Sequence, residues 1–193
     1  MFNKIIAKEG YKSVFSFLIL TIFFVIIDCD FLSFIFFALI LWFAFIYRNN
    51  RFIKNYDEID IVSPVSGKVS AIDIKDNRKL IYIDVSLLNN HILRSPKSGE
   101  FKVETTRGVY TFLDSLKAKK LNEKTMIQYD DMKIELICSL FCNRVEISQT
   151  NAFKGDKLAV FLHGQIVLEL DNSKDLLVNI GSQLQSGRTV IAR

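Results

Sequence analysis

The chain has 193 residues and a net charge of +4, with 25 basic and 21 acidic residues. It shows no stripe of Lys and Arg interleaved with aromatic residues, so nucleic acid is not expected as a partner. Hydrophobic residues make up 50% of the chain, and most of the excess lies before residue 48. This uneven distribution predicts an apolar segment ahead of one ordinary domain.

Two almost wholly apolar runs, residues 13–27 and 31–47, dominate the first part of the chain. One helix through both would be about 50 Å long, against a hydrocarbon core of about 30 Å, and would place Asp28 and Asp30 inside the membrane. The runs therefore predict a transmembrane helical hairpin over residues 1–48. Because they are short and the turn between them is tight, a hairpin that enters the membrane without crossing it stays open. A cleaved signal peptide fits less well, since a second apolar run follows the first.

Basic residues flank the predicted hairpin on both sides. They are Lys4, Lys8 and Lys12 before the first run, and Arg48, Arg51 and Lys54 after the second. The positive-inside rule then places both ends in the cytoplasm. We therefore expect a protein of the cytoplasmic (inner) membrane whose following domain faces the cytoplasm.

A polar linker over residues 49–62 and an all-β domain over residues 63–193 are predicted to follow. Short alternating segments are separated by turn signals, which is typical of β-strands. The predicted strands are residues 67–74, 79–85, 100–105, 109–112, 126–129, 132–138, 144–148, 157–170, 176–180 and 189–192. Only residues 112–121 could hold a short helix, with Asp114 or Ser115 as its cap.

The strand over residues 157–170 is interrupted by Gly164, with His163 before it and Gln165 after it. A glycine inside a strand indicates either a bulge or a place where a backbone or ligand comes close. His163 is either an ordinary strand histidine or a polar group of a pocket.

The chain has three cysteines, Cys29, Cys138 and Cys142, without a CxxC motif and without histidines at zinc-finger spacing. We expect buried thiols in a reducing compartment and no metal site.

Several motifs occur in an order that resembles a known family. They are residues 45–51, 63–69, 89–99, 122–124, 143–145, 154–158 and 181–192. Along nearly its whole length the chain resembles the short, bacterial and archaeal type of phosphatidylserine decarboxylase proenzyme. The resemblance implies a membrane enzyme of phosphatidylethanolamine synthesis that cuts itself at a Gly-Ser bond. The serine becomes a pyruvoyl group, a cofactor made from the chain, which forms a Schiff base with the substrate amine.

In the family, the serine works with an aspartate and a histidine. Here His91 stands at the histidine position, with Arg94 in the same motif, whereas Ser66 stands at the aspartate position and Gly164-Gln165 aligns with the Gly-Ser pair. Pyruvoyl formation needs an oxygen or sulfur on Cβ, which glutamine lacks. A serine hydroxyl also cannot supply the charge of a carboxylate. We therefore expect a chain that stays whole and carries no cofactor.

Three functions remain open at this stage. The first is an active phosphatidylserine decarboxylase; cleavage at Gly181-Ser182, the only Gly-Ser pair, would release only the last strand. The second, which we favour, is a non-catalytic member that binds membrane phospholipid and forms a homodimer or pairs with an active copy. The third is an adaptor, because the Pro-x-x-Gly turns entering strands resemble those of lipoyl-like domains in membrane-tethered adaptors. If the family alignment is right, His91 and Arg94 lie close to Gly164-Gln165.

Overall fold

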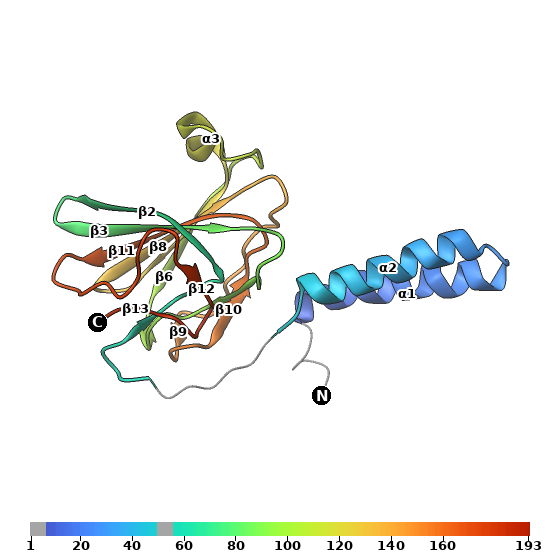
Figure 1. Ribbon diagram of the computed structural model, residues 1–193, viewed down its shortest axis with the longest axis horizontal. Helices are drawn as coiled ribbons and strands as arrows, with labels where there is room; N and C mark the ends of the chain where they lie inside the picture. Colours follow the sequence, from blue (N-terminus) through green and yellow to red (C-terminus); the bar gives the residue numbers. More distant parts are fainter. Residues whose placement is uncertain (1–6, 50–55) are drawn as a thin grey trace. The chain divides into compact units, whose positions relative to one another are not determined.

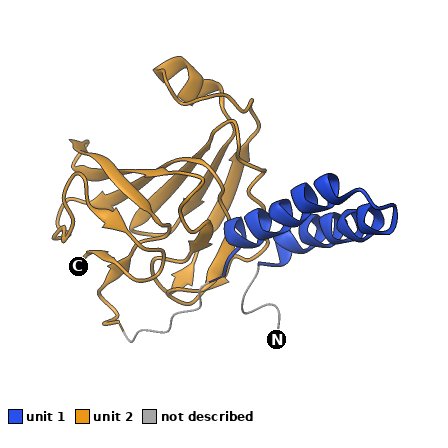
Figure 2. Ribbon diagram, turned by 45° about the vertical axis from the view of Figure 1, so that its right-hand side comes forward, with its two compact units in different colours: residues 1–51 blue, residues 52–193 orange. Residues whose placement is uncertain are grey.

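The computed structural model describes residues 7–49 and 56–193. Contacts divide the chain into two compact units, residues 1–51 and 52–193 (Figure 2). Part of the predicted linker 49–62 lies outside the described residues, as do Lys4, Arg51 and Lys54 of the predicted orientation signal.

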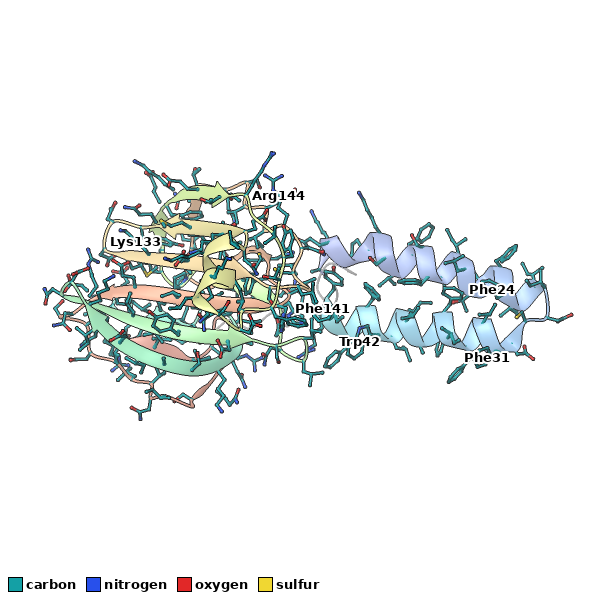
Figure 3. The ribbon with its side chains drawn as sticks, turned by 90° about the horizontal axis from the view of Figure 1, so that it is seen from above. Phe24, Phe31, Trp42, Lys133, Phe141 and Arg144 are labelled. Atoms are coloured by element: carbon teal, nitrogen blue, oxygen red, sulfur yellow. The ribbon has the colours of Figure 1, made fainter. Side chains whose placement is uncertain are left out.

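The first unit is a pair of helices with a short turn between them (Figure 1). A 3-10 turn, η2 (Lys8–Gly10), leads into α1 (Tyr11–Ile26), and α2 (Asp30–Ile46) follows. Asp28 allows the tight connection by adopting a φ of 54°. Phe24 and Phe31 lie near this turn, at the end where the helices join (Figure 3). Both predicted helices are therefore present.

Aromatic rings hold the two helices together in an antiparallel arrangement. Phe17 packs against Phe36 and Phe43 with ring centroids 6.2 and 5.1 Å apart. At the other end of the pair the Ala7 amide donates to the Tyr47 carbonyl. Of the described helices, the segment Lys8–Ile26 is long and apolar enough to cross a membrane by length and composition, and α2 is shorter.

The second unit is built of antiparallel strands and one short helix, α3 (Leu116–Leu121). Its strands are β1 (Ile61–Val62), β2 (Gly67–Lys75), β3 (Arg78–Val85), β4 (Ile92–Arg94), β5 (Gly99–Glu100), β6 (Lys102–Thr106), β7 (Lys124–Gln128), β8 (Met132–Cys138), β9 (Asn151–Ala152), β10 (Lys157–Val160), β11 (Gly164–Asp171), β12 (Gln183–Leu184) and β13 (Val190–Ala192).

Seven of these strands form one sheet in the order β12-β2-β3-β11-β8-β7-β6. Three two-stranded sheets, β1-β13, β10-β4 and β5-β9, complete the unit. Alternate residues of the central strands, such as Ile83, Ile134 and Ile166, are fully buried, as the two-residue period of a strand requires. They share one core with Leu93 and Ala159 of the small β10-β4 sheet. The predicted all-β domain is thus confirmed, and α3 projects from it in Figure 1.

Three predicted strands, at residues 109–112, 144–148 and 176–180, are wrong, because none of them forms a ladder. Val109 makes only a single bridge to Asn122, and Leu176 only one to Ala192. These segments alternate because some of their side chains, such as that of Val145, are buried against the core. Burial alone produced the pattern, since no described strand forms a ladder with them.

The single strand predicted over residues 157–170 is also wrong, because the structure divides it. β10 pairs with β4, whereas β11 pairs with β3 and β8 in the large sheet. The division lies just before Gly164, whose φ of +148° redirects the chain. The predicted helix is present but shorter, and its cap at Ser115 is confirmed, since Ser115 Oγ accepts from the Ala118 amide at 3.1 Å.

Candidate functional site

Gly164 begins β11 in the middle of the large sheet, between Val85 of β3 and Cys138 of β8. A Cβ atom at this position would lie 2.2 Å from the Ile137 carbonyl oxygen and 2.9 Å from Phe161 Cζ. Together with its positive φ, this close approach means that only glycine fits. Gly164, which the resemblance sets at the family's cleavage glycine, is therefore a point of tight backbone packing.

Gln165 is buried and bridges two structural elements through its side-chain amide. Its Nε2 donates to Asp84 Oδ1 at 2.8 Å, and its Oε1 accepts from Lys119 Nζ at 2.9 Å. Asp84 lies directly opposite on β3, while Lys119 comes from α3. The glutamine thus ties the short helix to the sheet, and both ends of its amide are occupied.

Gly164 and Gln165 line a cavity of about 690 Å³. Its other lining residues are Lys68, Asp84, Val85, Ser86, Asn89, Phe112, Leu113, Asp114, Lys119, Ser139, His163 and Gln183. The volume falls within the range of about 300–1,000 Å³ that is usual for small-molecule sites. Two lysines, Lys68 and Lys119, and two aspartates, Asp84 and Asp114, line the cavity. These charges of both signs suit a ligand that has a negatively and a positively charged group.

His163 also faces this cavity, next to Gly164. Its Nδ1 is buried and has no hydrogen-bond partner among the described residues. Its ring packs edge-on against Phe141, with centroids 5.9 Å apart. Burial lowers the pKa of His163 from its usual 6.5, which favours the neutral imidazole.

His91 is buried beside the turn that leads to Gly164, but it does not line the cavity. Its backbone carbonyl accepts from the Phe161 amide at 2.8 Å, which joins it to the segment between β10 and β11. Its Nε2 lies 3.0 Å from the Leu87 carbonyl oxygen. A carbonyl can only accept, so Nε2 carries a proton in this contact.

The side chain of Arg94 is directed toward the turns at Gly155 and Gly187. Its Nη1 donates to the Gly155 carbonyl at 2.9 Å, and its Cδ would lie 2.7 Å from a Cβ at Gly187. In the β10-β4 pair it stands opposite Lys157, whereas both side-chain hydrogen bonds of Gln165 go to Lys119 and Asp84. The structure therefore gives Arg94 a role in holding turns together.

Ser66 is buried where the glycine-containing turns of the sequence meet. Its Oγ accepts from the Ser186 amide at 2.9 Å, and Ser186 Oγ lies 2.7 Å from the Ile92 carbonyl oxygen. The Arg94 amide in turn donates to the Pro64 carbonyl at 2.8 Å. These turns brace one another, and Ser66 is not among the residues that line the cavity.

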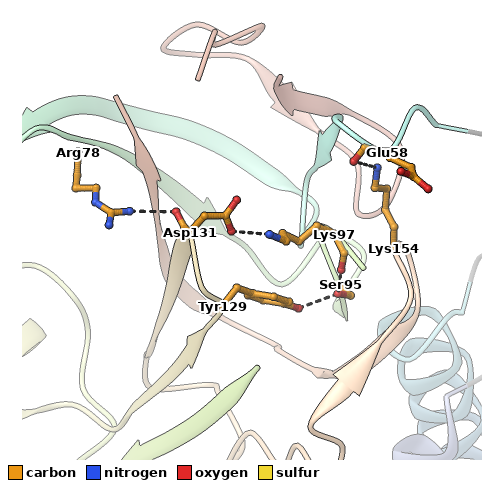
Figure 4. Close-up of polar contacts among 7 residues, drawn as sticks. All are labelled: Glu58, Arg78, Ser95, Lys97, Tyr129, Asp131 and Lys154. Atoms are coloured by element: carbon orange, nitrogen blue, oxygen red, sulfur yellow. Dashed lines mark hydrogen bonds and ion pairs between the residues drawn. The ribbon is translucent and has the colours of Figure 1, made fainter. Parts of the chain in front are cut away.

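A second cavity, also of about 690 Å³, is lined by Lys97, Lys154 and Asp131 among others. Two of its lysines, Lys97 and Lys154, are held by structural contacts (Figure 4). Lys97 Nζ lies 2.5 Å from Asp131 Oδ1, and Lys154 Nζ donates to the Glu58 carbonyl at 3.1 Å. Arg78 donates to the Asp131 carbonyl at 3.0 Å. Gly164 and Gln165, which the sequence singled out, line the first cavity and not this one, so the cavity at Gln165 is the better candidate site.

Two residues of the candidate site, Asp84 and Lys119, were not singled out by the sequence. Asp84 lies in an ordinary strand pattern and Lys119 in an ordinary helix pattern, and neither belongs to a recognisable motif. The thiols of Cys138 and Cys142 are buried as expected, whereas Cys29 is partly exposed. Within residues 7–49 and 56–193, no group of three His, Cys, Asp or Glu residues could hold a metal ion.

Comparison with known proteins identifies the family. The family model described as phosphatidylserine decarboxylase matches residues 39–192. The phosphatidylserine decarboxylase proenzyme of Amoebophilus asiaticus is 26% identical over 170 residues, covering 79% of this chain and 76% of the relative. Proteins of the same name from Syntrophotalea carbinolica and Desulfotalea psychrophila are each 24% identical, covering 98% and 97% of this chain and 96% of each relative. No solved structure shows a significant match. Because the family model spans most of the chain, the chain belongs to the phosphatidylserine decarboxylase family.

Proposed function

We propose that this chain is a membrane-anchored, non-catalytic member of the family that acts in phospholipid biosynthesis by binding phospholipid. The family link to phospholipid metabolism rests on the matching family model and on the named relatives. The non-catalytic role rests on one observation, the anchored Gln165 at the position of the cleavage serine.

The chemistry of self-cleavage needs a side-chain oxygen or sulfur that attacks the preceding carbonyl carbon and later leaves from Cβ. Gln165 offers a methylene at Cβ and an amide further out. That amide is held between Asp84 and Lys119, so it is not free to approach the Gly164 carbonyl. The chain accordingly remains in one piece and makes no pyruvoyl group.

Phospholipid binding is supported by the charges of the cavity. A serine or ethanolamine head group carries a phosphate anion and an ammonium cation. Lys68 and Lys119 can attract the first, and Asp84 and Asp114 the second. Charged groups of both signs at one site favour such a head group over a simple anion.

Membrane anchoring is supported by the apolar helices α1 and α2. The segment Lys8–Ile26 meets the length and composition of a spanning helix, and large apolar side chains such as Phe15 and Phe31 are exposed along the pair. Apolar faces of this size need an apolar surrounding. With Lys8, Lys12 and Arg48 at the open end, we place the protein in the inner membrane with its β unit in the cytoplasm.

The experiment is an intact-mass measurement of the purified full-length chain. We expect one species at the full-length mass. The variants Gln165→Ser and Gln165→Ser/Ser66→Asp, prepared in the same way, test whether the pocket can regain cleavage when the missing groups are supplied. Gln165→Asn serves as the matched control, because it shortens the side chain without adding an oxygen on Cβ.

An active decarboxylase is the alternative function, and family membership is what favours it. Its only Gly-Ser pair is Gly181-Ser182, where Ser182 Oγ accepts from the Asn179 amide at 3.0 Å in a turn before β12. A C-terminal fragment that begins with a blocked residue at position 182 would overturn the non-catalytic proposal. A whole chain that gains decarboxylase activity only with an active family member would instead support pairing between the two.

A further inference from the structure

Large apolar side chains are exposed on the loop before α3, on α3 itself and on the loop after β8, close in the chain to residues that line the cavity at Gln165. We call this set the aromatic rim: Phe112, Leu116, Leu140 and Phe141. The exposed fractions of Phe112, Leu116 and Phe141 are 55%, 80% and 51%. Exposed residues scattered singly need no explanation, but a contiguous group beside a cavity does.

Ring contacts make the rim continuous with the cavity. The rings of Phe112 and Phe141 lie edge to face, with centroids 6.2 Å apart. Phe141 then contacts the ring of His163, and both Phe112 and His163 line the cavity. A molecule that touches the rim therefore stands directly at the opening of the candidate site.

Basic side chains accompany the rim. The helix α3 carries Lys117, Lys119 and Lys120 in a single turn and a half. Lys119 is bound to Gln165, while Lys117 and Lys120 are exposed beside Leu116. Aromatic and leucine side chains next to lysines are typical of surfaces that insert into the head-group region of a membrane, where lysines are attracted to anionic lipid.

We propose that the aromatic rim inserts into the surface of a bilayer that contains anionic phospholipid, so that the cavity at Gln165 opens toward the lipid head groups. This inference rests on the proposed phospholipid-binding function and adds the route by which lipid reaches the site. It commits to a lipid surface because the exposed lysines complement anionic lipid and because the rim is continuous with the cavity.

The test uses the full-length chain reconstituted into vesicles of phosphatidylcholine and phosphatidylglycerol, with plain or brominated acyl chains. Trp42, the only tryptophan, is first replaced by phenylalanine. A tryptophan is then placed in the rim as Phe141→Trp, or as Phe112→Trp in a second variant. The matched control is Phe153→Trp, because Phe153 is 76% exposed, lies beside Lys154 and lines the other cavity.

We expect brominated lipid to quench the rim tryptophans by about half and the Phe153→Trp control hardly at all, because bromine quenches only residues that reach the acyl chains. Reversing the charge with Lys117→Glu/Lys120→Glu should weaken the quenching at position 141, as should high salt. Unchanged quenching after charge reversal would overturn the choice of an anionic surface.

The absence of quenching at positions 112 and 141 would overturn the proposal. It would do so even if the tryptophan emission were blue-shifted, because the residues would then be buried against a second copy of the chain and not in lipid. Equal quenching of the Phe153→Trp control would also overturn the proposal, since the rim would then reach the acyl chains no better than another exposed site. The intact mass of the same samples separates this inference from the proposed function. If the chain is whole and no quenching is seen, only the proposed insertion of the rim is contradicted. If the chain is cleaved and quenching is seen, only the proposed non-catalytic role is contradicted.

Discussion

At the scale of single residues, Gly164 and its two neighbours perform distinct physical tasks. Gly164 permits close contact between strands, Gln165 links α3 to the sheet, and His163 places its imidazole ring at the cavity. Gln165, which we propose stands at the position of the family's cleavage serine, therefore serves a structural contact in this chain. That change of role is consistent with the proposed loss of self-cleavage.

The substitution Gly164→Ala should destabilise the β unit by about 3 kcal/mol or more, because it combines backbone strain with a clash. The new Cβ would stand 2.2 Å from the Ile137 carbonyl oxygen at a φ of +148°. Gly155→Ala is the control, since it has a positive φ of +84° but open space around it, and it should cost only about 1–2 kcal/mol. Urea denaturation followed by near-ultraviolet circular dichroism measures both. Equal losses for the two variants would contradict the close approach at Gly164.

The stability of the β unit should fall as the pH drops below about 6.5, in part because of His163. Burial lowers the pKa of His163 in the folded state, so the unfolded chain takes up a proton that the folded chain does not. The contribution is therefore fully present above pH 6.5 and is lost as the pH falls toward the lower folded pKa. His163→Phe keeps the ring contact with Phe141 and should flatten this part of the profile. An identical pH profile in the variant would show that His163 does not titrate in this way.

At the scale of elements, α3 is the short helix of the β unit, and it reaches the large sheet at the candidate site. It has six residues, and it is held by the Ser115 cap and by the contact between Lys119 and Gln165. Helices this short are marginal without tertiary contacts. If the aromatic rim inserts as we propose, the contacts that hold α3 to the sheet set how far this helix can move at a lipid surface.

The substitution Ser115→Ala should weaken α3 locally by about 1 kcal/mol, because it removes the side-chain oxygen that accepts from the Ala118 amide. Hydrogen exchange should become faster over residues 116–121, while β8 and β11 keep their protection. Ser148→Ala, at an exposed site outside the helices and strands, is the control and should change neither. Faster exchange throughout the sheet would mean that α3 is an integral part of the core.

At the scale of the whole molecule, an apolar helix pair and an all-β unit share one short chain. The first supplies large exposed apolar surfaces, and the second supplies a polar cavity with an apolar rim. Both features suit the role at a membrane that we propose for this member of the phosphatidylserine decarboxylase family.

We predict that the C-terminus lies in the cytoplasm, because Lys8, Lys12 and Arg48 stand at the open end of the helix pair. A reporter that is active only in the cytoplasm, fused after Arg193, should be active, and one that is active only outside it should be silent. Replacing Lys8 and Lys12 by glutamine should weaken this bias. Activity of the outer reporter in the unaltered chain would reverse the proposed orientation.

Local pattern was sufficient for the two apolar helices and for the longer strands of the large sheet. The strand predicted at residues 132–138 is β8, because Met132, Ile134 and Leu136 face the core in strict alternation. The helices α1 and α2 also follow from their unbroken apolar runs. The family itself could be inferred from the sequence, since its motifs are short and keep their order. Where alternation marked only burial, as at Val145, the same reasoning failed.

The candidate site depended on tertiary structure. Gln165 meets Asp84 across 81 positions of the chain and Lys119 across 46, and neither contact follows from a local pattern. Strand register decides the first contact, and the approach of α3 to the sheet decides the second. The sequence by itself placed Gln165 after Gly164, and a glutamine at that position has no oxygen or sulfur on Cβ from which a pyruvoyl group could form. Only the folded chain decided what that glutamine holds instead, because its partners are set by the packing of distant segments around one core.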